Sequence, residues 1–520
     1  MNANDNARAG RPRETTTRRR FLIGAAGTFG TIAAPGSFYA MVDAIAKPPV
    51  RPAVSPRRPR EEQYLLHNTR VINLDGAGLQ SRHGSVALEV PPLYHQVVTA
   101  RLDVAADPAT LQEAQGHLAS VVRELERAYA PTPSGVGITL AWGLPYFERY
   151  IPALGVVSEF FAAGTRYPAY LPKDLVTSKA EGRTVYALQH ARRFPSDEAP
   201  AGFGPVRLED NDLAVVLRSD SLAHIADASN AIFGRGPGRA GELFTVTSVR
   251  QGFNGGGFYG KQGLPRKLAL AAEIPGAQSI PPQAQAFLGF ASTLVSNMGP
   301  GRIANLETLP GYTDQWPNGY FTQGTTMHLS HIYEDLETWY EKRFPTYRQR
   351  VDAMQYPGIS PAPSAGTLAL QPPGQSEAQV AHGLRRYHGY GHSGSLSVVD
   401  STASDLTDRY GERYPSGTTI PVRSDFNTLD NPFHYTSDPV NDRYKDTPAA
   451  GLHFVMFQPT IGVFNQVRLA MDARYGENAL PLSPRSPHAG INSVLHTTHR
   501  QNYLVPPRRH RSFPLAEYLA

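Results

Sequence analysis

The sequence predicts an α+β protein of two similar halves, each an antiparallel sheet with helices packed on one face. Three observations predict this class. From residue 93 to residue 253 the chain alternates between the two-residue period of strands and the 3.6-residue period of helices. A second alternating run, at 451–475, has the same layout near the C-terminus. The chain also has 520 residues, which is too many for one small core.

The N-terminal half, residues 86–300, contains a complete set of alternating elements. The predicted order is a strand at 93–104, a helix at 108–130, a strand at 135–143, a strand and a helix within 212–233, and a strand at 242–253. Strand, helix, strand, strand, helix, strand is the order of the ferredoxin-like unit. We therefore expect one such unit in this half.

The C-terminal half, residues 301–520, repeats part of this layout. Residues 325–344 predict a strand that leads into a helix, and residues 451–475 predict a strand, a short polar break and a helix. The second segment parallels 212–233, which indicates a duplication. Coincidence is the alternative, because short strand–helix patterns are common. A Pro/Gly/Ser-rich stretch at 357–379 predicts a surface loop.

The first 46 residues resemble a twin-arginine export signal. Arg18 to Arg20 precede Phe21-Leu22 and a Gly/Ala-rich apolar stretch, and the best cleavage pattern is Ala44-Ile45-Ala46. The apolar stretch is too short and too rich in glycine for a membrane span. We expect export of the folded protein to the periplasm, the cell wall or the medium. The alternative is a disordered basic tail.

Composition narrows the possible functions. The chain has no cysteine, which excludes disulfides, thiolate metal sites and cysteine nucleophiles. The formal net charge of +5 comes with basic residues concentrated near the N-terminus, including the Pro/Arg-rich linker and lead-in at 47–85. Without long basic–aromatic interleaving, nucleic acid is not indicated as a partner. Gly-x-Ser-x-Gly is absent, so a hydrolase nucleophile elbow is not indicated either.

One loop carries an isolated acid. Residues 309–319 read LPGYTDQWPNG, and Gly311-Tyr312-Thr313-Asp314 resembles the Gly-x-x-Asp-Gly signature of dye-decolourising (DyP-type) haem peroxidases, with Gln315 at the second glycine. Further segments resemble the family in the same order: 135–147, 208–228, 249–257, 328–340 and 451–472. The resemblance extends over about residues 86–475, and it is stronger in order and layout than in identity.

The resemblance implies a fold, a cofactor and a site. It implies two ferredoxin-like halves of the dimeric α/β-barrel type, with haem b in the C-terminal half. Asp314 would be the acid that moves a proton of hydrogen peroxide, and Arg423 would stabilise the departing oxygen and contact the haem side. A histidine would ligate the iron. The implied function is an exported peroxidase that oxidises a small organic donor, and an oligomer is possible.

The histidine ligand is the least certain part of the implied site. In the family it precedes the arginine by about two dozen residues or fewer, and here that window holds no histidine. The nearest upstream candidates are His392 and His388, which fit if residues 401–417 are an insertion. The alternative is loss of the ligand. The chain would then be an exported binding or structural protein without haem.

Each candidate also has a structural interpretation. Asp314 could cap the turn that follows it, and Arg423 could form an ion pair with Asp425. His392 and His388 could be surface-loop histidines.

A metal site without haem is a further alternative. His328, His331, Glu334 and Asp335 are close in sequence, and His382 lies near His388 and His392. Imidazoles and carboxylates bind divalent metals. In a strand, however, His328 and His331 point to opposite faces, which disfavours a shared metal.

Overall fold

The structure is a computed structural model. It describes residues 61–63, 70–73, 87–130, 132–151, 170–197, 205–255, 262–282, 284–289, 304–315, 319–358, 375–408, 411, 413–432, 448–475, 478–479 and 490–519. The predicted export signal at 1–46 and most of the linker at 47–85 lie outside these residues, as does most of the predicted loop at 357–379. Among the described residues, no helix is both long enough and apolar enough to cross a membrane.

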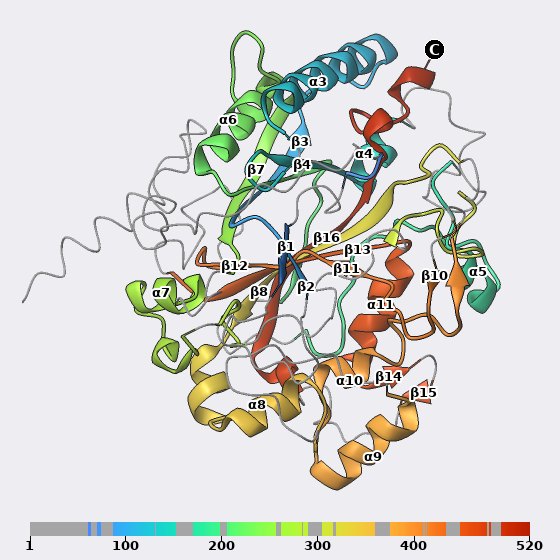
Figure 1. Cartoon of the computed structure of the whole chain (residues 1–520). Coiled ribbons are helices and arrows are strands. Elements are labelled where there is room, and N and C mark those ends of the chain that lie inside the picture. Colours follow the sequence, from blue (N-terminus) through green and yellow to red (C-terminus); the bar gives the residue numbers. More distant parts are fainter. Residues whose placement is uncertain are drawn as a thin grey trace, which may run out of the picture.

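Eight antiparallel strands form a closed barrel (Figure 1). They are β3 (Tyr94–Leu102), β4 (Gly137–Gly143), β6 (Leu213–Ser219), β7 (Phe244–Phe253), β8 (Thr325–Glu334), β12 (Phe426–Thr428), β13 (Gly451–Gln458) and β16 (Leu495–Val505). Around the barrel the order is β8, β13, β12, β7, β3, β6, β4 and β16, which pairs with β8 again. The predicted α+β class with antiparallel sheet is therefore confirmed.

Short strands extend or flank the barrel. The strand β11 (Val422–Arg423) pairs with β13 beside β12, and β5 (Arg207–Leu208) pairs with β16 in parallel. Three two-stranded ribbons complete the set: β1 (Arg70–Asn73) with β2 (Ala87–Val90), β9 (Leu406–Thr407) with β10 (Arg413–Tyr414), and β14 (Arg474–Tyr475) with β15 (Asn478–Ala479).

The barrel is closed along two short seams. One run of the chain supplies the neighbouring strands β7, β3, β6 and β4, and a later run supplies β16, β8, β13 and β12. Strand β12 meets β7 at the single registered pair Asn427↔Phe253. Strand β16 meets β4 at two registered pairs, Tyr503↔Gly143 and Leu504↔Trp142. Most pairings inside each run are much longer, as between β13 and β8, although β12 meets β13 at only three registered pairs.

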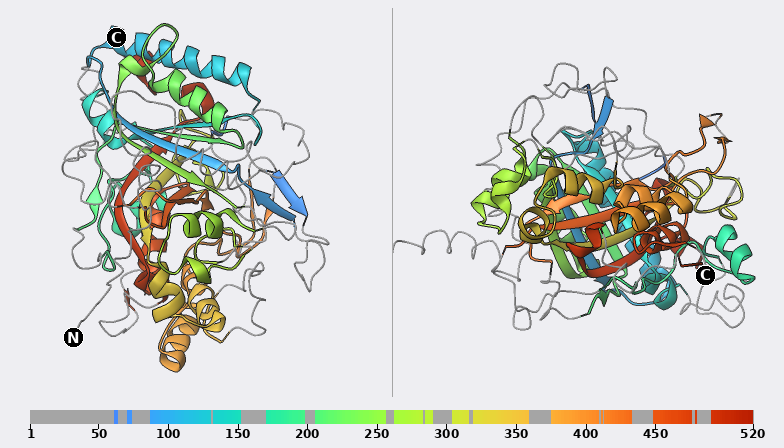
Figure 2. Two further views of the ribbon diagram at one scale, coloured as in Figure 1. Left: turned by 90° about the vertical axis from the view of Figure 1, so that its left-hand side faces the viewer. Right: turned by 90° about the horizontal axis from the view of Figure 1, so that it is seen from below.

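The helices gather at two ends of the molecule (Figures 1 and 2). Helices α3 and α6 lie side by side at one end, and α8, α9 and α10 lie at the other. The helices are α3 (Pro108–Ala128), α4 (Leu144–Arg149), α5 (Leu175–Glu181), α6 (Leu222–Phe233), α7 (Leu264–Ala271), α8 (Tyr347–Met354), α9 (Glu377–Tyr387), α10 (His392–Leu396) and α11 (Ile461–Ala470). After β8, where the sequence predicted an ordinary helix, the chain forms one π-helical turn at Thr338–Lys342.

Helix α3 illustrates how the sequence sets these boundaries. The Asp107 carboxylate accepts the backbone N–H of Thr110, and Pro108 occupies the first turn, where its missing N–H costs nothing. The helix buries one stripe at helical spacing: Leu111, Ala114, Leu118, Val121, Val122 and Leu125.

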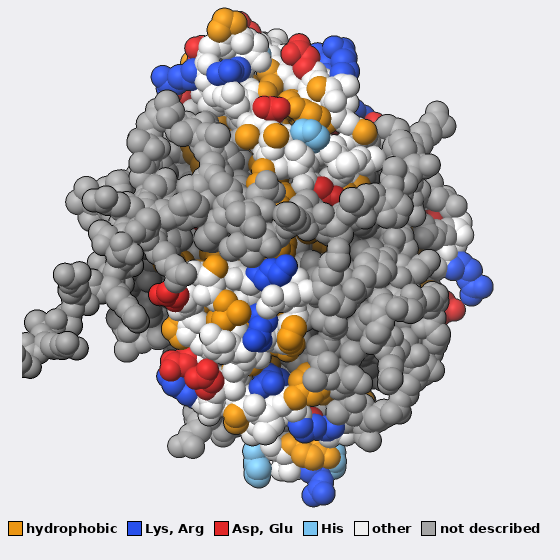
Figure 3. All heavy atoms as spheres, turned by 60° about the vertical axis from the view of Figure 1, so that its left-hand side comes forward, with side chains coloured by type: hydrophobic (Ala, Val, Ile, Leu, Met, Phe, Trp, Pro, Cys, Tyr) orange, Lys and Arg blue, Asp and Glu red, His pale blue; other side chains and the backbone are white. Residues whose placement is uncertain are grey.

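On the face shown in Figure 3, exposed charged side chains of both signs lie beside hydrophobic ones.

Strand β13 has two buried faces with different surroundings. Val455 and Phe457 point into the barrel, where they join an apolar cluster with Met327 and Leu329. Because successive side chains alternate, Phe454 and the other even-numbered neighbours point outward. That outer face is covered by α10 and α11 rather than by solvent, and the cavity described next lies between them.

Candidate functional site

A cavity of about 280 Å³ lies between the outer face of the C-terminal strands and the helices α10 and α11. Strands β8, β13 and β16 supply one wall, and the run from β11 to β12 supplies an edge. Apolar side chains form much of the lining: Leu396, Leu452, Phe454, Met456, Phe464, Val467 and Met471. Charged and ionisable side chains also reach it: Glu334, His392, Asp400, Arg423, Asp425, Arg468 and Arg500.

His392 lies at the first residue of α10 and lines this cavity. Burial, together with the nearby cations Arg423 and Arg468, lowers the pKa of its imidazole to about 3. The ring is therefore neutral at physiological pH. Its Nδ1 atom is buried and has no hydrogen-bond partner among the described residues. A neutral imidazole without a protein partner is the form that ligates a metal.

Arg423 ends β11 and reaches the same cavity. Within the described part of the chain, its guanidinium forms no hydrogen bond and no ion pair with a side chain. The alternative interpretation, a structural ion pair with Asp425, is therefore not formed, although the two charges influence each other. A partly buried guanidinium whose donors have no partner among the described residues is suited to an anionic ligand group.

Three carboxyl groups of the cavity have raised pKa values. Burial raises the pKa of Asp425 to about 6 and that of Asp400 to about 7, and the Arg423 charge opposes both shifts. Burial, together with the Asp425 charge, raises the pKa of Glu334 to about 8. Glu334 therefore holds its proton at neutral pH. Clustered acids with shifted pKa values in a cavity are typical of functional sites.

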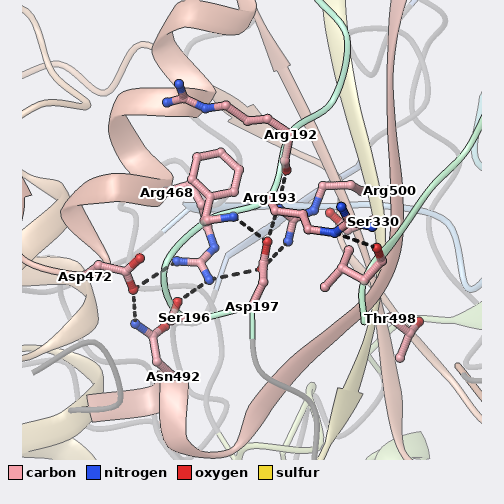
Figure 4. Close-up of polar contacts among 12 residues, drawn as sticks. Arg192, Arg193, Ser196, Asp197, Ser330, Arg468, Asp472, Asn492, Thr498 and Arg500 are labelled. Carbon is pink, nitrogen blue, oxygen red and sulfur yellow. Dashed lines mark hydrogen bonds and ion pairs between the residues drawn. The ribbon is translucent and has the colours of Figure 1, made fainter. Parts of the chain in front are cut away.

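Two further arginines of the cavity wall form ion pairs with buried carboxylates (Figure 4). Arg500 donates to both oxygens of Asp197, at 2.9 Å from Nη1 to Oδ2 and 2.5 Å from Nη2 to Oδ1. Arg468 lies 3.5 Å from Asp197 and 3.2 Å from Asp472. The Asp472 carboxylate also accepts the amide N–H of Asn492 at 3.0 Å. These two arginines therefore fix the wall, whereas Arg423 is available to a ligand.

Asp314 lies outside this cavity. Its Oδ1 accepts the backbone N–H of Lys173 at 3.0 Å and the side-chain amide of Gln315 at 3.2 Å. The ammonium of Lys173 is 3.9 Å from its Oδ2, and the side chain of Asp314 is about one-third exposed, at 33%. The structure therefore brings His392 and Arg423 together but does not bring Asp314 to them. In this position Asp314 holds its loop against residue 173.

His388 also lies away from the cavity lining. It follows the last residue of α9 and takes a left-handed backbone conformation, with φ of 55°, as a helix C-cap. Of the two histidines that the sequence offered as iron ligands, only His392 lines the cavity.

The alternative of a metal site without haem gains no support. His328 and His331 point to opposite faces of β8, as expected: His328 stacks on Phe464 of α11, and His331 lies inside the barrel against His453. Among the described residues, no three His, Asp or Glu side chains are arranged to hold a metal ion.

The sequence interpretation missed the cavity acids. It considered Asp425 only as an ion-pair partner of Arg423, and Glu334 only as a metal ligand. One signal was available, because Asp425 follows Arg423 by two residues and a strand places such residues on one face. Asp400 carried no comparable signal.

Comparisons with known proteins give one matching family model and several solved structures of similar fold. The family model described as "Family of unknown function (DUF7405)" matches residues 182–368 and 409–507. No curated protein matches the chain.

The solved structures similar to this chain include several DyP-type peroxidases. The DyP-type peroxidase from Cellulomonas bogoriensis is 17% identical, with a TM-score of 0.46, over 83% of this chain and 95% of that one. The dye-decolorizing peroxidase from Bacteroides thetaiotaomicron is 10% identical, with a TM-score of 0.42, over 85% and 98%. The encapsulated DyP-type peroxidase from Mycobacterium smegmatis is 11% identical, with a TM-score of 0.42, over 81% and 94%. At these values the likeness assigns no activity and no residue role to this chain.

Proposed function

The chain belongs to the family of unknown function DUF7405, and we propose that it is an exported haem peroxidase that reduces hydrogen peroxide and oxidises an organic donor. One observation carries the proposal. His392 and Arg423 line the same largely apolar cavity, and the sequence had indicated them as iron ligand and charge-stabilising residue. Neither side chain forms a hydrogen bond or an ion pair with a described residue.

The residues of the cavity fit haem b. A bound haem would need a protein ligand for its iron, such as an imidazole, and an apolar environment for the macrocycle. His392 supplies a neutral ring, and its buried Nδ1 has no described partner. Phe454, Phe464 and Val467 supply apolar surface on two sides of the cavity. His392 would hold the iron, and Arg423 would face a bound anion or peroxide.

The chain's own residues have defined roles in this proposal. When bound, haem supplies a redox-active iron through which electrons of the organic donor reach the peroxide. Arg423 donates N–H groups to the oxygen that departs with negative charge, which stabilises the transition state. The burial of His392 keeps its imidazole neutral and available as a ligand. The apolar lining excludes bulk water and strengthens these polar contacts. The proton-transfer role that the resemblance assigns to Asp314 remains a prediction without support from its position.

We also propose that the barrel consists of two ferredoxin-like units. The strand order supports this, because β7-β3-β6-β4 and β16-β8-β13-β12 both place the four strands of a unit in the order 4-1-3-2. The alternative is that similar strand orders arose without duplication. Superposition of the two sets of four strands with their helices tests the idea, and poor overlap of α6 with α11 would count against it.

Export through the twin-arginine machinery is part of the same proposal. Its support is the sequence of residues 1–46 alone. A reporter fused to these residues should leave the cytoplasm. When Arg18, Arg19 and Arg20 are replaced with lysine, the reporter should stay in the cytoplasm. Export that persists in the lysine variant would contradict this route.

The first experiment records the visible spectrum of the full chain expressed with added haem. We expect a strong Soret band, and we expect His392→Ala to weaken or shift it because the iron loses its axial ligand. His388→Ala is the matched control, since His388 lies outside the cavity lining, and it should leave the band unchanged. Peroxide consumption with an organic donor is measured next.

The competing function is an exported binding or structural protein without haem. The position of Asp314 outside the cavity favours it, because one residue of the implied site is not in place. A folded chain that shows no Soret band with added haem would establish this alternative and reject the peroxidase.

A further inference from the structure

We propose that Asp425, rather than Asp314, is the acid–base residue of the cavity and moves a proton between the two oxygens of hydrogen peroxide. This assignment rests on the proposed peroxidase function and deepens it. Its basis is the position of the Asp425 carboxyl group relative to Arg423, the strand β13 and the cavity.

Asp425 lies on the same face of the chain as Arg423. The two residues are two positions apart in the extended run from β11 to β12, so their side chains point the same way. Both line the cavity. A peroxide that accepts hydrogen bonds from Arg423 therefore has a carboxyl group at its side.

The Asp425 carboxyl group is held at one oxygen only. Its Oδ1 accepts the backbone N–H of Val455 at 3.0 Å, and its own carbonyl accepts the side-chain amide of Asn254 at 3.0 Å. These two contacts fix the residue against β13 and the end of β7. Its Oδ2 has no hydrogen-bond partner among the described residues. An acid with one anchored oxygen and one available oxygen is oriented for proton transfer.

The two other carboxyl groups of the cavity are less suited to this role. Glu334 is buried, with 2% of its surface exposed, and it keeps its proton at neutral pH because its pKa is about 8. It therefore cannot accept one. Asp400 is also near Arg423, but its carboxyl group interacts with its own backbone N–H and is not anchored to a strand. The pKa of Asp425, about 6, leaves it ionised at neutral pH and able to accept a proton.

The proton step balances without a further reactant. Hydrogen peroxide, two electrons and two protons give two waters, and the reduced organic donor supplies both the electrons and the protons. Asp425 Oδ2 takes a proton from one peroxide oxygen and returns it to the other, which leaves as the first water when the O–O bond breaks, and the remaining oxygen becomes the second water with the two electrons and two protons of the donor. Arg423 stabilises the negative charge on the leaving oxygen until that proton arrives.

The test compares Asp425→Asn with Asp314→Asn in the full chain loaded with haem. We expect Asp425→Asn to lower kcat/KM for hydrogen peroxide by about 10²–10⁴-fold with an unchanged Soret band, because an amide cannot carry the proton. Asp425→Glu should recover part of the loss. Asp314→Asn should stay within about threefold of the wild type, since its carboxylate holds a surface loop.

A second readout is independent of turnover. Infrared titration of the haem-free protein should show a buried carboxyl group that ionises near pH 6. That signal should be missing from Asp425→Asn and present in Asp314→Asn. In the active enzyme, kcat/KM should fall as the pH drops below about 6, because protonated Asp425 cannot act as the base.

Three outcomes would overturn the assignment. Full activity of Asp425→Asn, or a large loss in Asp314→Asn alone, would return the role to another residue. An equal loss in Asp400→Asn would show that the total charge of the cavity matters and not one carboxyl group. A wild-type protein that binds haem but consumes no peroxide would instead reject the proposed function, and the assignment with it.

Discussion

The ionisable residues that line the cavity differ in how their charges are compensated. Arg468 and Arg500 are neutralised by buried carboxylates, but Glu334 has no cationic partner in the described part of the chain. Its Oε2 atom is buried without a described hydrogen-bond partner. A buried carboxyl group in this position stays protonated at neutral pH. It lowers the folding stability only when the pH is high enough to ionise it.

The raised pKa of Glu334 predicts how the substitution Glu334→Gln changes the free energy of unfolding. Burial and the Asp425 charge raise the pKa of Glu334 to about 8 in the folded protein, well above its ordinary value of 4.5. Between these two values the folded state binds more protons than the unfolded state, so folding stability falls as the pH rises. Removing the group should increase the free energy of unfolding at pH 9 by on the order of 2 kcal/mol and change little at pH 4.

Denaturant unfolding across this pH range is the measurement. Glu341→Gln, at an exposed position of the π-helical turn, is the control and should leave the pH dependence unchanged. A Glu334→Gln variant whose stability follows the wild-type curve at every pH would show that Glu334 is ionised in the folded protein.

At the scale of elements, Asp197 connects its part of the chain to both α11 and β16. Asp197 pairs with Arg468 from the helix and Arg500 from the strand (Figure 4). The side chains of Asp197 and Arg500 are 2% and 1% exposed, so the pairs are shielded from solvent. Breaking a buried pair by removing one partner is costly because the other charge is left uncompensated.

We therefore expect Asp197→Asn to lower the free energy of unfolding by about 3–5 kcal/mol. The amide keeps the shape of the side chain but leaves two buried arginines without their shared carboxylate. Asp405→Asn removes an exposed pair with Arg413 at the surface and should change stability by less than about 1 kcal/mol. Chemical denaturation measures the free energy of unfolding of both variants. Equally small losses in Asp197→Asn and Asp405→Asn would show that water reaches the ion pairs of Asp197.

The sequence predicted the long strands and helices between β3 and β7, but it missed β12 and β16 of the barrel and the arrangement of the site. Strands and helices from β3 to β7 follow directly from local period and capping, as Asp107 and Pro108 illustrate for α3. Closure of the barrel depends on pairings between strands far apart in the chain, which no local pattern encodes. Asp314 was chosen from a motif, but the packing of its loop against residue 173 decides where its carboxylate points.

At the scale of the whole molecule, the interior of the barrel contains a layer of histidines. His331 lies between His453 and His499, with ring centroids 4.4 Å and 5.3 Å apart, on three adjacent strands. Burial lowers the pKa of His499 to about 4 and that of His453 well below its ordinary value, with nearby Arg250 acting in the same direction. Both nitrogens of His453 are buried without a described hydrogen-bond partner.

His453→Phe should stabilise the barrel. A phenyl ring has a similar shape and removes two polar atoms that gain no hydrogen bond, which is worth about 1 kcal/mol at pH 7. The gain should grow below pH 6.5, where the unfolded wild type takes up a proton that folded His453 refuses. Thermal unfolding at pH 5 and pH 7 measures both effects.

His331→Phe is the matched comparison. Its Nε2 lies 2.9 Å from Thr428 Oγ1, so this substitution breaks a hydrogen bond that His453→Phe leaves intact, and it should destabilise the barrel. A loss of stability in His453→Phe as large as that in His331→Phe would mean that the imidazole of His453 is hydrogen-bonded in solution, for example to water.

The two short seams of the barrel determine how it would respond to mechanical load. Three registered pairs, one at Asn427↔Phe253 and two between β16 and β4, hold the two strand sets edge to edge. A pulling force that crosses these seams would therefore act on few backbone hydrogen bonds at once. In an optical trap we expect the two sets to part there first, before the long pairings of β3 with β7 and of β8 with β13 and β16 break.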